Sequence, residues 1–468
     1  MNLTELLDQA VVRWPSKAAI IDGDQCLSYG DLAGEVAQAS SKLREFGLSF
    51  GNRVGLLLPN SSDYIVLTFA LWRIDAVVVP VPTECTEKEL SEIATTMGLQ
   101  AILSHKPLQR GLSFGNNSWF IRLSPEPVPD NHGLNIAFIR FTSGTTNARK
   151  GVVLCHESVS ERVASANRSL RIGPNDTVMW SLPMSHHFLI TIVLYLSQGS
   201  TIVLFRQLVA RAFLETVNRR KATILYGTPF QFALLARDNS EIGLSSVRLA
   251  VSTTCPLPQD VAEDFLNRFN IPLSQALGVI ELGLVTLNSD APVRHWNSVG
   301  RPAHHFQVRI IAPDNNGWGE VAVRGPGMFD AYATPWLARA HVLQEGWFHT
   351  GDIGRLDADG FLFLVGRKSA VINLAGRKVF PEEIEAVLNR HPAIIESRAY
   401  GCSHPHLGET VEAEIILAQS SVDLQSVRDF CRASLAPFKI PSRLRVVDEL
   451  PRTSTAKIRR PVPVSQHD

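Results

Sequence analysis

The chain has 468 residues, of which 45% are hydrophobic and 19% are charged. This length exceeds what one hydrophobic core usually supports, so two or more domains are expected, and the composition is that of an ordinary soluble protein. Because 45 basic residues balance 45 acidic ones, the total charge gives no reason to expect binding to nucleic acid or to an anionic membrane.

The six cysteines are spaced singly along the chain, without a C-x-x-C pair. That pattern is typical of a reducing compartment and argues against structural zinc. Residues 1–5 include a glutamate where a secretory signal would be basic. The longest mainly apolar stretch, residues 188–196, falls short of the ~20 residues needed to cross a bilayer. We therefore expect a cytoplasmic protein without a transmembrane segment.

Residues up to 140 are patterned as an α/β region. Residues 18–21 and 27–29 predict two strands joined by a tight turn. Asp31 is the expected N-cap of the helix that follows. The apolar runs 54–58 and 76–81, with a helix between them, predict a β-α-β unit and hence a parallel sheet covered on both faces.

A loop of small and hydroxyl residues comes next, closed by a lysine and a glycine. It runs Phe141-Thr142-Ser143-Gly144-Thr145-Thr146-Asn147-Ala148-Arg149-Lys150-Gly151 between two apolar runs. Backbone N–H groups, hydroxyls and an ammonium in such a loop suit a polyanion, so phosphate binding is one interpretation. A Ser/Thr-rich turn in a β-hairpin is the other. The loop differs from the P-loop of nucleotide kinases, because Gly-Lys-Ser/Thr is missing at the required spacing.

This loop resembles the phosphate loop of the adenylate-forming enzymes. Seven further stretches resemble other motifs of that family and follow one another in the order that the family uses. That family contains acyl- and aryl-CoA synthetases, adenylation domains of nonribosomal peptide synthesis and luciferases, and the resemblance covers nearly the whole chain. It implies an α/β fold: a large N-terminal domain of parallel α/β sheets with a barrel-like subdomain over residues 1–367, and a small, mobile α+β domain over 368–468, hinged near Ser369. The ATP-binding residues that it implies in the loop are Thr142, Ser143, Gly144, Thr145, Thr146 and Lys150, with Thr145 also catalytic and a ligand of Mg²⁺.

The implied substrate pocket begins at Ser181-Leu182-Pro183-Met184-Ser185-His186-His187-Phe188. His186 falls where the family has the P-x-x-H histidine that lines the carboxylate site; a histidine pair that simply opens a helix over 189–196 is the alternative. Amino-acid-activating members place an acid nearby to hold the substrate ammonium. None of residues 181–196 is acidic, which favours a substrate without an α-amino group. The other pocket candidates are His187, Tyr226, Phe230, Leu277 and Gly283, of which Tyr226 and Phe230 fit a core role equally well.

The motifs expected at the nucleotide base are altered. Ser252-Thr253-Thr254-Cys255-Pro256-Leu257 stands where the family has S-G-G-A-P-L, so two threonines replace glycines that adopt positive φ freely. The family's next motif is Y-G-x-T-E, and its place is taken here by Ala276-Leu277-Gly278-Val279-Ile280-Glu281. Leu277 thus replaces the aromatic ring that covers adenine, and Ile280 replaces the threonine that reaches the AMP phosphate. The residues that the resemblance places at the nucleotide here are Thr254, Gly278, Val279 and Glu281, with Glu281 as the catalytic ligand of Mg²⁺.

Three later stretches complete the implied site. Gly346-Trp347-Phe348-His349-Thr350-Gly351-Asp352 implies that Asp352 accepts the ribose hydroxyls, and Arg367 is implied on the ribose or phosphate. Pro381 and the acids after it predict a helix N-terminus. Gly376 is the implied neighbour of the thiol substrate's pantetheine arm. Residues 450–458 resemble L-P-x-T-x-x-G-K-I, which makes Lys457 the implied catalytic lysine.

The implied reaction joins a small carboxylic acid, aromatic or acyl, to a thiol in two steps. The carboxylate attacks the α-phosphorus of ATP, and a thiol of CoA or of a free-standing phosphopantetheinyl carrier protein then displaces AMP. Mg²⁺ at Glu281, the loop donors and Lys457 are expected to neutralise the phosphate charge, with His186 at the carboxylate. Two other classes stay open: a degenerate, non-catalytic nucleotide- or acyl-binding protein, suggested by the altered motifs, and a stand-alone amino-acid adenylation protein.

Overall fold

The computed structural model covers most of the chain. It describes residues 1–107, 112–114 (backbone only), 119–124, 127–141, 151–207, 209–374, 377–404, 407–418, 422–452 and 458–460. These residues form two compact units. Unit 1 takes the residues up to 307 together with Val323–Phe348, and unit 2 takes Val308–Ala322 and the residues from 349 onwards. Each unit is described by itself.

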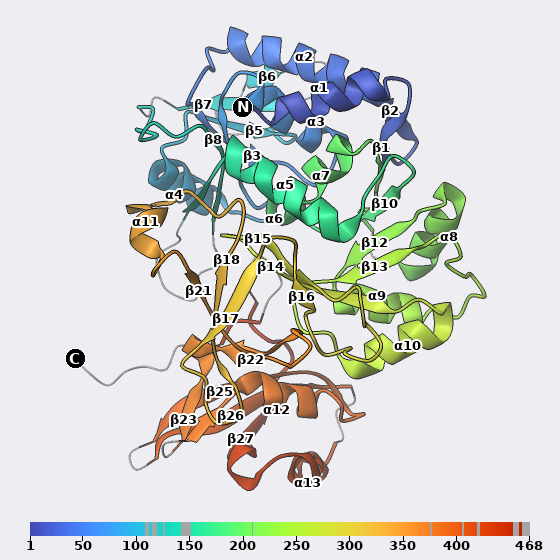
Figure 1. Ribbon diagram of the computed structural model, residues 1–468, viewed down its shortest axis with the longest axis vertical. Coiled ribbons are helices and arrows are strands. Elements are labelled where there is room, and N and C mark those ends of the chain that lie inside the picture. The colour runs from blue at the N-terminus through green and yellow to red at the C-terminus, as the bar shows by residue number, and fades with distance from the viewer. Residues whose placement is uncertain are drawn as a thin grey trace. The chain divides into compact units, whose positions relative to one another are not determined.

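In the part of the chain that the structure describes, unit 1 contains two nine-stranded sheets (Figure 1). The first has the strand order β16-β15-β14-β13-β12-β10-β11-β1-β2. Its parallel strands are β1 (Ala18–Asp22), β11 (Thr201–Leu204), β10 (Thr177–Trp180), β12 (Ile224–Gly227), β13 (Leu249–Ser252) and β14 (Leu273–Val279). Its antiparallel strands, at the two ends of the order, are β2 (Gln25–Ser28), β15 (Gly283–Leu287) and β16 (Arg301–Pro302).

The second sheet has the order β20-β19-β9-β8-β4-β3-β5-β7-β6. Its strands are β3 (Arg53–Leu57), β4 (Val77–Pro80), β5 (Ala101–Ser104), β6 (Leu112–Phe114), β7 (Trp119–Leu123), β8 (Ile136–Phe141), β9 (Gly151–Cys155), β19 (Ala331–Ala333) and β20 (Trp336–Ala338). Strands β3 and β4 pair in parallel on either side of helix α3 (Ser62–Trp72), which confirms the predicted β-α-β unit.

The other helices of unit 1 are α1 (Thr4–Arg13), α2 (Tyr29–Glu45), α4 (Glu87–Met97), α5 (His156–Leu170), α6 (Met184–His187), α7 (Ile192–Ser197), α8 (Ala210–Arg220), α9 (Pro229–Ala236), α10 (Gln259–Phe269) and α11 (Arg339–Val342). Two predictions about them were wrong. Ser28, not Asp31, caps α2: the Ser28 hydroxyl accepts from the Asp31 N–H, and the Asp31 carboxylate accepts from the Ser28 N–H, which is a capping box. The helix expected over 189–196 begins later than predicted, since residues 189–191 lie outside any helix and α7 runs from Ile192 to Ser197. No helix among the described residues has both the length and the apolar character needed to cross a bilayer.

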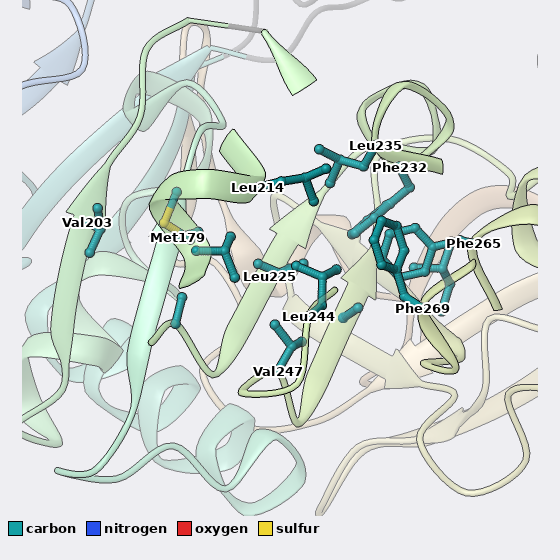
Figure 2. Close-up of a cluster of buried hydrophobic side chains, with 14 of the residues drawn as sticks. Met179, Val203, Leu214, Leu225, Phe232, Leu235, Leu244, Val247, Phe265 and Phe269 are labelled. Carbon is teal, nitrogen blue, oxygen red and sulfur yellow. The ribbon is translucent and has the colours of Figure 1, made fainter. Parts of the chain in front are cut away.

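A hydrophobic cluster fixes the carboxyl end of the first sheet. Figure 2 shows Leu225 of β12 in a cluster with Leu214 of α8, Phe232 of α9 and Phe265 of α10. Burial of each such side chain contributes about 1.5–3 kcal/mol. The cluster therefore holds the ends of β12 and β13, where Tyr226 and the Ser252–Thr254 turn lie.

Unit 2 is built on two smaller sheets. The first has the order β17 (Gln307–Ile311), β18 (Gly319–Arg324), β21 (Phe348–Leu356) and β22 (Leu362–Arg367). The second contains β24 (Arg377–Val379), β23 (Ile372–Leu374), β26 (Gly408–Leu417), β25 (Ile394–His404) and β27 (Arg443–Val446), covered by α12 (Pro381–Leu388) and α13 (Leu424–Ser434). Helix α12 begins with Pro381 in its first turn, as predicted. The predicted hinge residue, Ser369, lies in the short 3₁₀ turn Lys368–Ala370.

Candidate functional site

Part of the predicted site lies outside the described residues. These positions are Thr142, Ser143, Gly144, Thr145, Thr146, Lys150, Gly376 and Lys457. The strands that flank the phosphate loop are described: β8 and β9 pair antiparallel, with Phe141 opposite Gly151. The loop therefore joins neighbouring strands, which agrees with both interpretations of its sequence.

Glu281 lies in the turn between β14 and β15 and is only 9% exposed. The Tyr332 hydroxyl, from β19, donates to Glu281 Oε1 at 3.0 Å. Burial, and then the charge of Glu281, raises the pKa of the Tyr332 phenol, which keeps its proton available for this bond. Burial lowers the pKa of two guanidinium groups, Arg140 and Arg162; the charge of Glu281 opposes this shift at both, after the charge of Asp330 in the case of Arg162. Two cations and a hydroxyl thus compensate the buried carboxylate.

This surrounding fits the metal that the sequence predicts at Glu281. Within the described residues, no group of three or more His, Cys, Asp or Glu side chains is placed to hold a metal ion. Mg²⁺ takes one or two carboxylates from a protein and keeps water and substrate phosphates as its other ligands. A single carboxylate therefore suits Mg²⁺ that arrives with nucleotide phosphates, and does not suit a metal held by protein ligands alone.

His186, predicted at the substrate carboxylate, and His187, predicted in the pocket, lie on the one-turn helix α6 and are half-buried. Asn60, which the sequence analysis did not select, positions this segment. Its amide donates to Leu182 O at 2.8 Å, and its Oδ1 accepts from the Met184 N–H at 2.8 Å. The His187 ring contacts Trp180 at a centroid distance of 6.3 Å. His187 thus belongs to an aromatic cluster, next to His186.

Tyr226 and Trp180 stack at the end of the parallel strands, with ring centroids 5.9 Å apart. Beside them a mostly apolar pocket opens between α8 and α9, and its lining includes Ser181, Phe213, Tyr226, Gly227 and Phe232. Phe230, expected on the pocket wall, is instead 64% exposed in the first turn of α9, and Phe232 faces the pocket in its place. Both lie in an almost uninterrupted apolar segment, so the sequence pattern does not separate them.

The remaining pocket and nucleotide candidates of unit 1 lie on the β14–β15 hairpin. Leu277 is half-buried opposite Thr286, Gly278 is exposed, and Val279 pairs with Gly283. Gly283 is buried with φ +88°, and a Cβ there would lie 3.2 Å from Arg162 Cδ. Its missing side chain makes room for Arg162, a role that the sequence analysis did not foresee.

The altered turn after β13 contains a strained residue. Thr254 has φ +79°, the left-handed region in which glycine is at ease and a β-branched residue is an outlier. The sequence analysis noted that both threonines replace residues that adopt positive φ freely, and it did not predict which of the two would adopt such a φ. Thr253 is buried and has an ordinary φ. Only the second threonine of the pair therefore carries the conformational cost.

In unit 2, Asp352 and Arg367 form an ion pair. They are directly opposite on β21 and β22, and Arg367 Nε lies 2.7 Å from Asp352 Oδ1. Arg367 Nη1 also donates to Thr350 O at 2.8 Å, while the Asp352 N–H donates to the Thr350 hydroxyl at 3.0 Å. The structure thus brings together the two residues predicted at the ribose. The pairing was missed because a β-bulge after Ile353 sets the strand register.

Glu382, at the start of α12, is a second acid of unit 2 that is largely removed from water, with a side chain 21% exposed. Arg460 binds it at 2.9 Å and binds Glu385 at 2.6 Å, so the segment three residues after Lys457 is anchored on α12. A Cβ at Gly366 would meet Glu382 Oε2 at 2.3 Å, so the backbone of β22 closes over the carboxylate. Burial raises the pKa of Glu382 from its usual 4.5 to about 6, and Arg460 opposes this shift.

Two family models match the chain: AMP-binding enzyme over residues 7–333, and AMP-binding enzyme C-terminal domain over residues 383–457. The 2-succinylbenzoate–CoA ligase of Bacillus licheniformis is 27% identical over 482 residues, which cover 98% of this chain and 99% of the ligase. The probable CoA ligase CCL9 of Humulus lupulus is 30% identical over 512 residues, which cover 100% of this chain and 96% of the relative.

Solved structures share the fold. The o-succinylbenzoate CoA synthetase of Bacillus subtilis, in complex with the acyl-adenylate intermediate OSB-AMP, has a TM-score of 0.86 and 24% identity, covering 97% of this chain and 96% of that one. The anthranilate CoA ligase AuaEII, in complex with anthranoyl-AMP, has a TM-score of 0.83 and 23% identity, covering 98% and 96%. These likenesses confirm the predicted α/β fold class.

The strain at Thr254 predicts that Thr254→Gly stabilises the protein. A non-glycine residue in the left-handed region costs about 1–3 kcal/mol, and the greater freedom of glycine in the unfolded chain offsets part of the gain. We expect a net increase in the free energy of unfolding of about 1 kcal/mol, measured by chemical denaturation. Thr253→Gly is the matched control and should destabilise. The strain interpretation is wrong if both variants destabilise equally.

The buried Glu382 predicts a pH dependence of stability. Its folded pKa of about 6 exceeds its usual 4.5, so its ionisation disfavours the folded state. Its contribution is absent below pH 4.5 and lowers the free energy of unfolding by about 2 kcal/mol as the pH rises past 6. Glu382→Gln should remove this decrease, so the variant gains on the wild type between pH 4.5 and 7 in denaturation experiments. Glu383→Gln, which removes the neighbouring carboxylate bound to Lys439, should not reproduce the gain.

Proposed function

Because the chain belongs to the AMP-binding enzyme family, we propose that it activates an uncharged aromatic or short-to-medium acyl carboxylic acid and transfers the acyl group to CoA. The chain is an ATP-dependent, AMP-forming acid–thiol ligase. The observation that carries the assignment of its active centre is the buried carboxylate of Glu281, held by Tyr332. A binding protein that had lost catalysis would have no need to maintain so costly a group.

In the first step a carboxylate oxygen attacks the α-phosphorus of ATP, the bond to pyrophosphate breaks, and acyl-AMP forms. His186 would orient the carboxylate at the end of α6. Glu281 would hold Mg²⁺, which neutralises phosphate charge as the leaving group departs. The loop donors Thr142, Ser143, Gly144, Thr145, Thr146 and Lys150, with Thr145 also at the metal, would bind the phosphates.

Residues of unit 2 take the other parts of the nucleotide in this proposal. Asp352 accepts the ribose hydroxyls and shares its charge with Arg367, which lies 2.7 Å away. Lys457 neutralises the charge that develops on the phosphate oxygens in the first step. Unit 1 supplies Thr254, Gly278 and Val279 beside the base, where Leu277 offers a poorer stacking surface than an aromatic ring.

In the second step the thiol sulfur attacks the acyl carbon and AMP leaves. We propose a movement of the small domain about the region near Ser369 between the steps, with Gly376 beside the pantetheine arm. CoA is the acceptor on which we base the experiments, and a free-standing carrier protein is the alternative. We place the reaction in the cytoplasm.

The apolar pocket supports the proposed class of acid. Phe213, Phe232 and Tyr226 line it, and Ser181, Gln207 and Gln231 contribute polar side chains. No acidic residue lies among residues 181–196 to pair with a substrate ammonium. Relatives named for 2-succinylbenzoate and feruloyl-CoA act on aromatic acids, which fits such a lining.

A panel of acids tests this function. Pyrophosphate release should be fastest with an aromatic or short-to-medium acyl acid and should continue with CoA to a thioester. An α-amino acid should react slowly, because an unpaired buried ammonium costs several kcal/mol. Fatty, aromatic and amino acids are compared, with CoA and a carrier protein supplied in turn. The substrate proposal fails if an α-amino acid is fastest, and the degenerate class is favoured if no acid reacts.

Lys457→Ala separates the two half-reactions. Acyl-AMP formation should decrease by ~10²-fold or more, the scale of losing one electrostatic stabiliser of a transition state. Thioester formation from supplied acyl-AMP should survive, because pyrophosphate has already left and the transition state that Lys457 stabilises has been passed. Quenched-flow measurement of each half-reaction checks this, and equal loss of both contradicts the proposed role.

A further inference from the structure

Arg162 is a buried arginine on α5 that the proposed mechanism does not use. Its side chain is only 3% exposed. Its guanidinium donates to three backbone carbonyls: Ile280 O at 2.8 Å, Glu281 O at 2.6 Å and, through Nε, Gly327 O. Two of these carbonyls belong to the turn that carries the Glu281 carboxylate.

Two glycines from separate segments leave the space that Arg162 fills. Gly283 has φ +88°, and a Cβ there would lie 3.2 Å from Arg162 Cδ. Gly327 has φ +62°, and a Cβ there would lie 2.3 Å from Ser158 O and 2.6 Å from Arg162 Cγ. Backbone from both segments therefore closes around this side chain, and a larger residue at either glycine would displace it.

The acceptors of Arg162 distinguish it from an ordinary structural arginine. Burying a guanidinium is costly, and within the described residues the hydrogen bonds of Arg162 go to backbone carbonyls. All three acceptors lie in the two segments that hold Glu281: its own turn, and residues 327–332, whose Tyr332 binds the carboxylate. The Glu281 carbonyl also accepts from the Phe329 N–H at 2.7 Å, which ties the same two segments together.

We propose that Arg162 is a positioning residue that fixes the Glu281 turn so that the carboxylate is ready to bind a divalent cation with ATP. Arg162 joins the Glu281 turn to the Gly327–Tyr332 segment, and its five fixed donors suit several carbonyls at once. Without this link the backbone of the Glu281 turn loses two of its hydrogen bonds, those to the Ile280 and Glu281 carbonyls, and the carboxylate is held less firmly in place. The inference rests on the proposed role of Glu281 at the metal.

The test measures ATP binding as a function of Mg²⁺ by titration calorimetry, together with the melting temperature of each variant. In the wild type, ATP affinity should increase with Mg²⁺. Arg162→Gln should raise the Mg²⁺ concentration for half-maximal effect by about tenfold or more, the range found when a residue supporting a metal ligand is lost. Arg162→Lys keeps the charge but not the planar donors, so its half-maximal Mg²⁺ concentration should lie between those of the wild type and Arg162→Gln. Arg168→Gln, an exposed arginine on the same helix, should behave like the wild type.

A double-mutant cycle decides between positioning and general stability. In a Glu281→Gln background, Arg162→Gln should have no further effect on the Mg²⁺ dependence, because the residue that it positions has lost its charge. Equal weakening by Arg162→Gln in both backgrounds overturns the proposal, as does a wild-type Mg²⁺ dependence in Arg162→Gln. If Arg162→Gln does not fold, Arg162→Lys in both backgrounds takes its place. If Glu281→Gln leaves the Mg²⁺ dependence unchanged, the proposed role of Glu281 is wrong and the inference falls with it.

Discussion

The burial of the Glu281 carboxylate is the constraint around which unit 1 is arranged. A carboxylate removed from water must be compensated by hydrogen bonds and opposite charge. Tyr332 supplies the first, and the guanidinium groups of Arg140 and Arg162 supply the second. These groups come from β19, β8 and α5. Elements from both sheets thus converge on one charge, and a shift in any of them would leave it unbalanced.

In the proposed nucleotide site, the residues expected beside the base make less favourable interactions than the residues around Glu281. Thr254 keeps a backbone conformation made for glycine, and Leu277 stands where a ring would stack. The buried charges around Glu281 are compensated by specific partners. This contrast is physically reasonable: a weaker contact with adenine lowers affinity in the ground state, whereas a misplaced carboxylate removes stabilisation of the reacting phosphate.

Local sequence patterns predicted helices and strands, but they could not predict contacts between residues that are far apart in the sequence. The apolar runs at 54–58 and 76–81 predicted β3 and β4, and Pro381 predicted the start of α12. Arg162 could not be selected, because its acceptors lie 118 and 119 residues away and a helical arginine is usually exposed. Phe230 and Phe232 were indistinguishable in an apolar helix. The Asp352–Arg367 contact depends on a bulged register that no alternation of residues encodes.

Arginine and lysine have different roles in the proposed site. Arg162, Arg367 and Arg460 each bind one fixed set of oxygens: backbone carbonyls for Arg162, and carboxylates for Arg367 and Arg460. A guanidinium suits this task, because it stays charged when buried and its planar donors bind two or more acceptors in one geometry. The charge that appears on phosphate during the reaction is different, since it exists for one step only. The ammonium group proposed for this role, that of Lys457, is compact and lies on a flexible side chain, so it can approach the phosphate during that step and move away afterwards. An arginine held by several partners cannot move in this way.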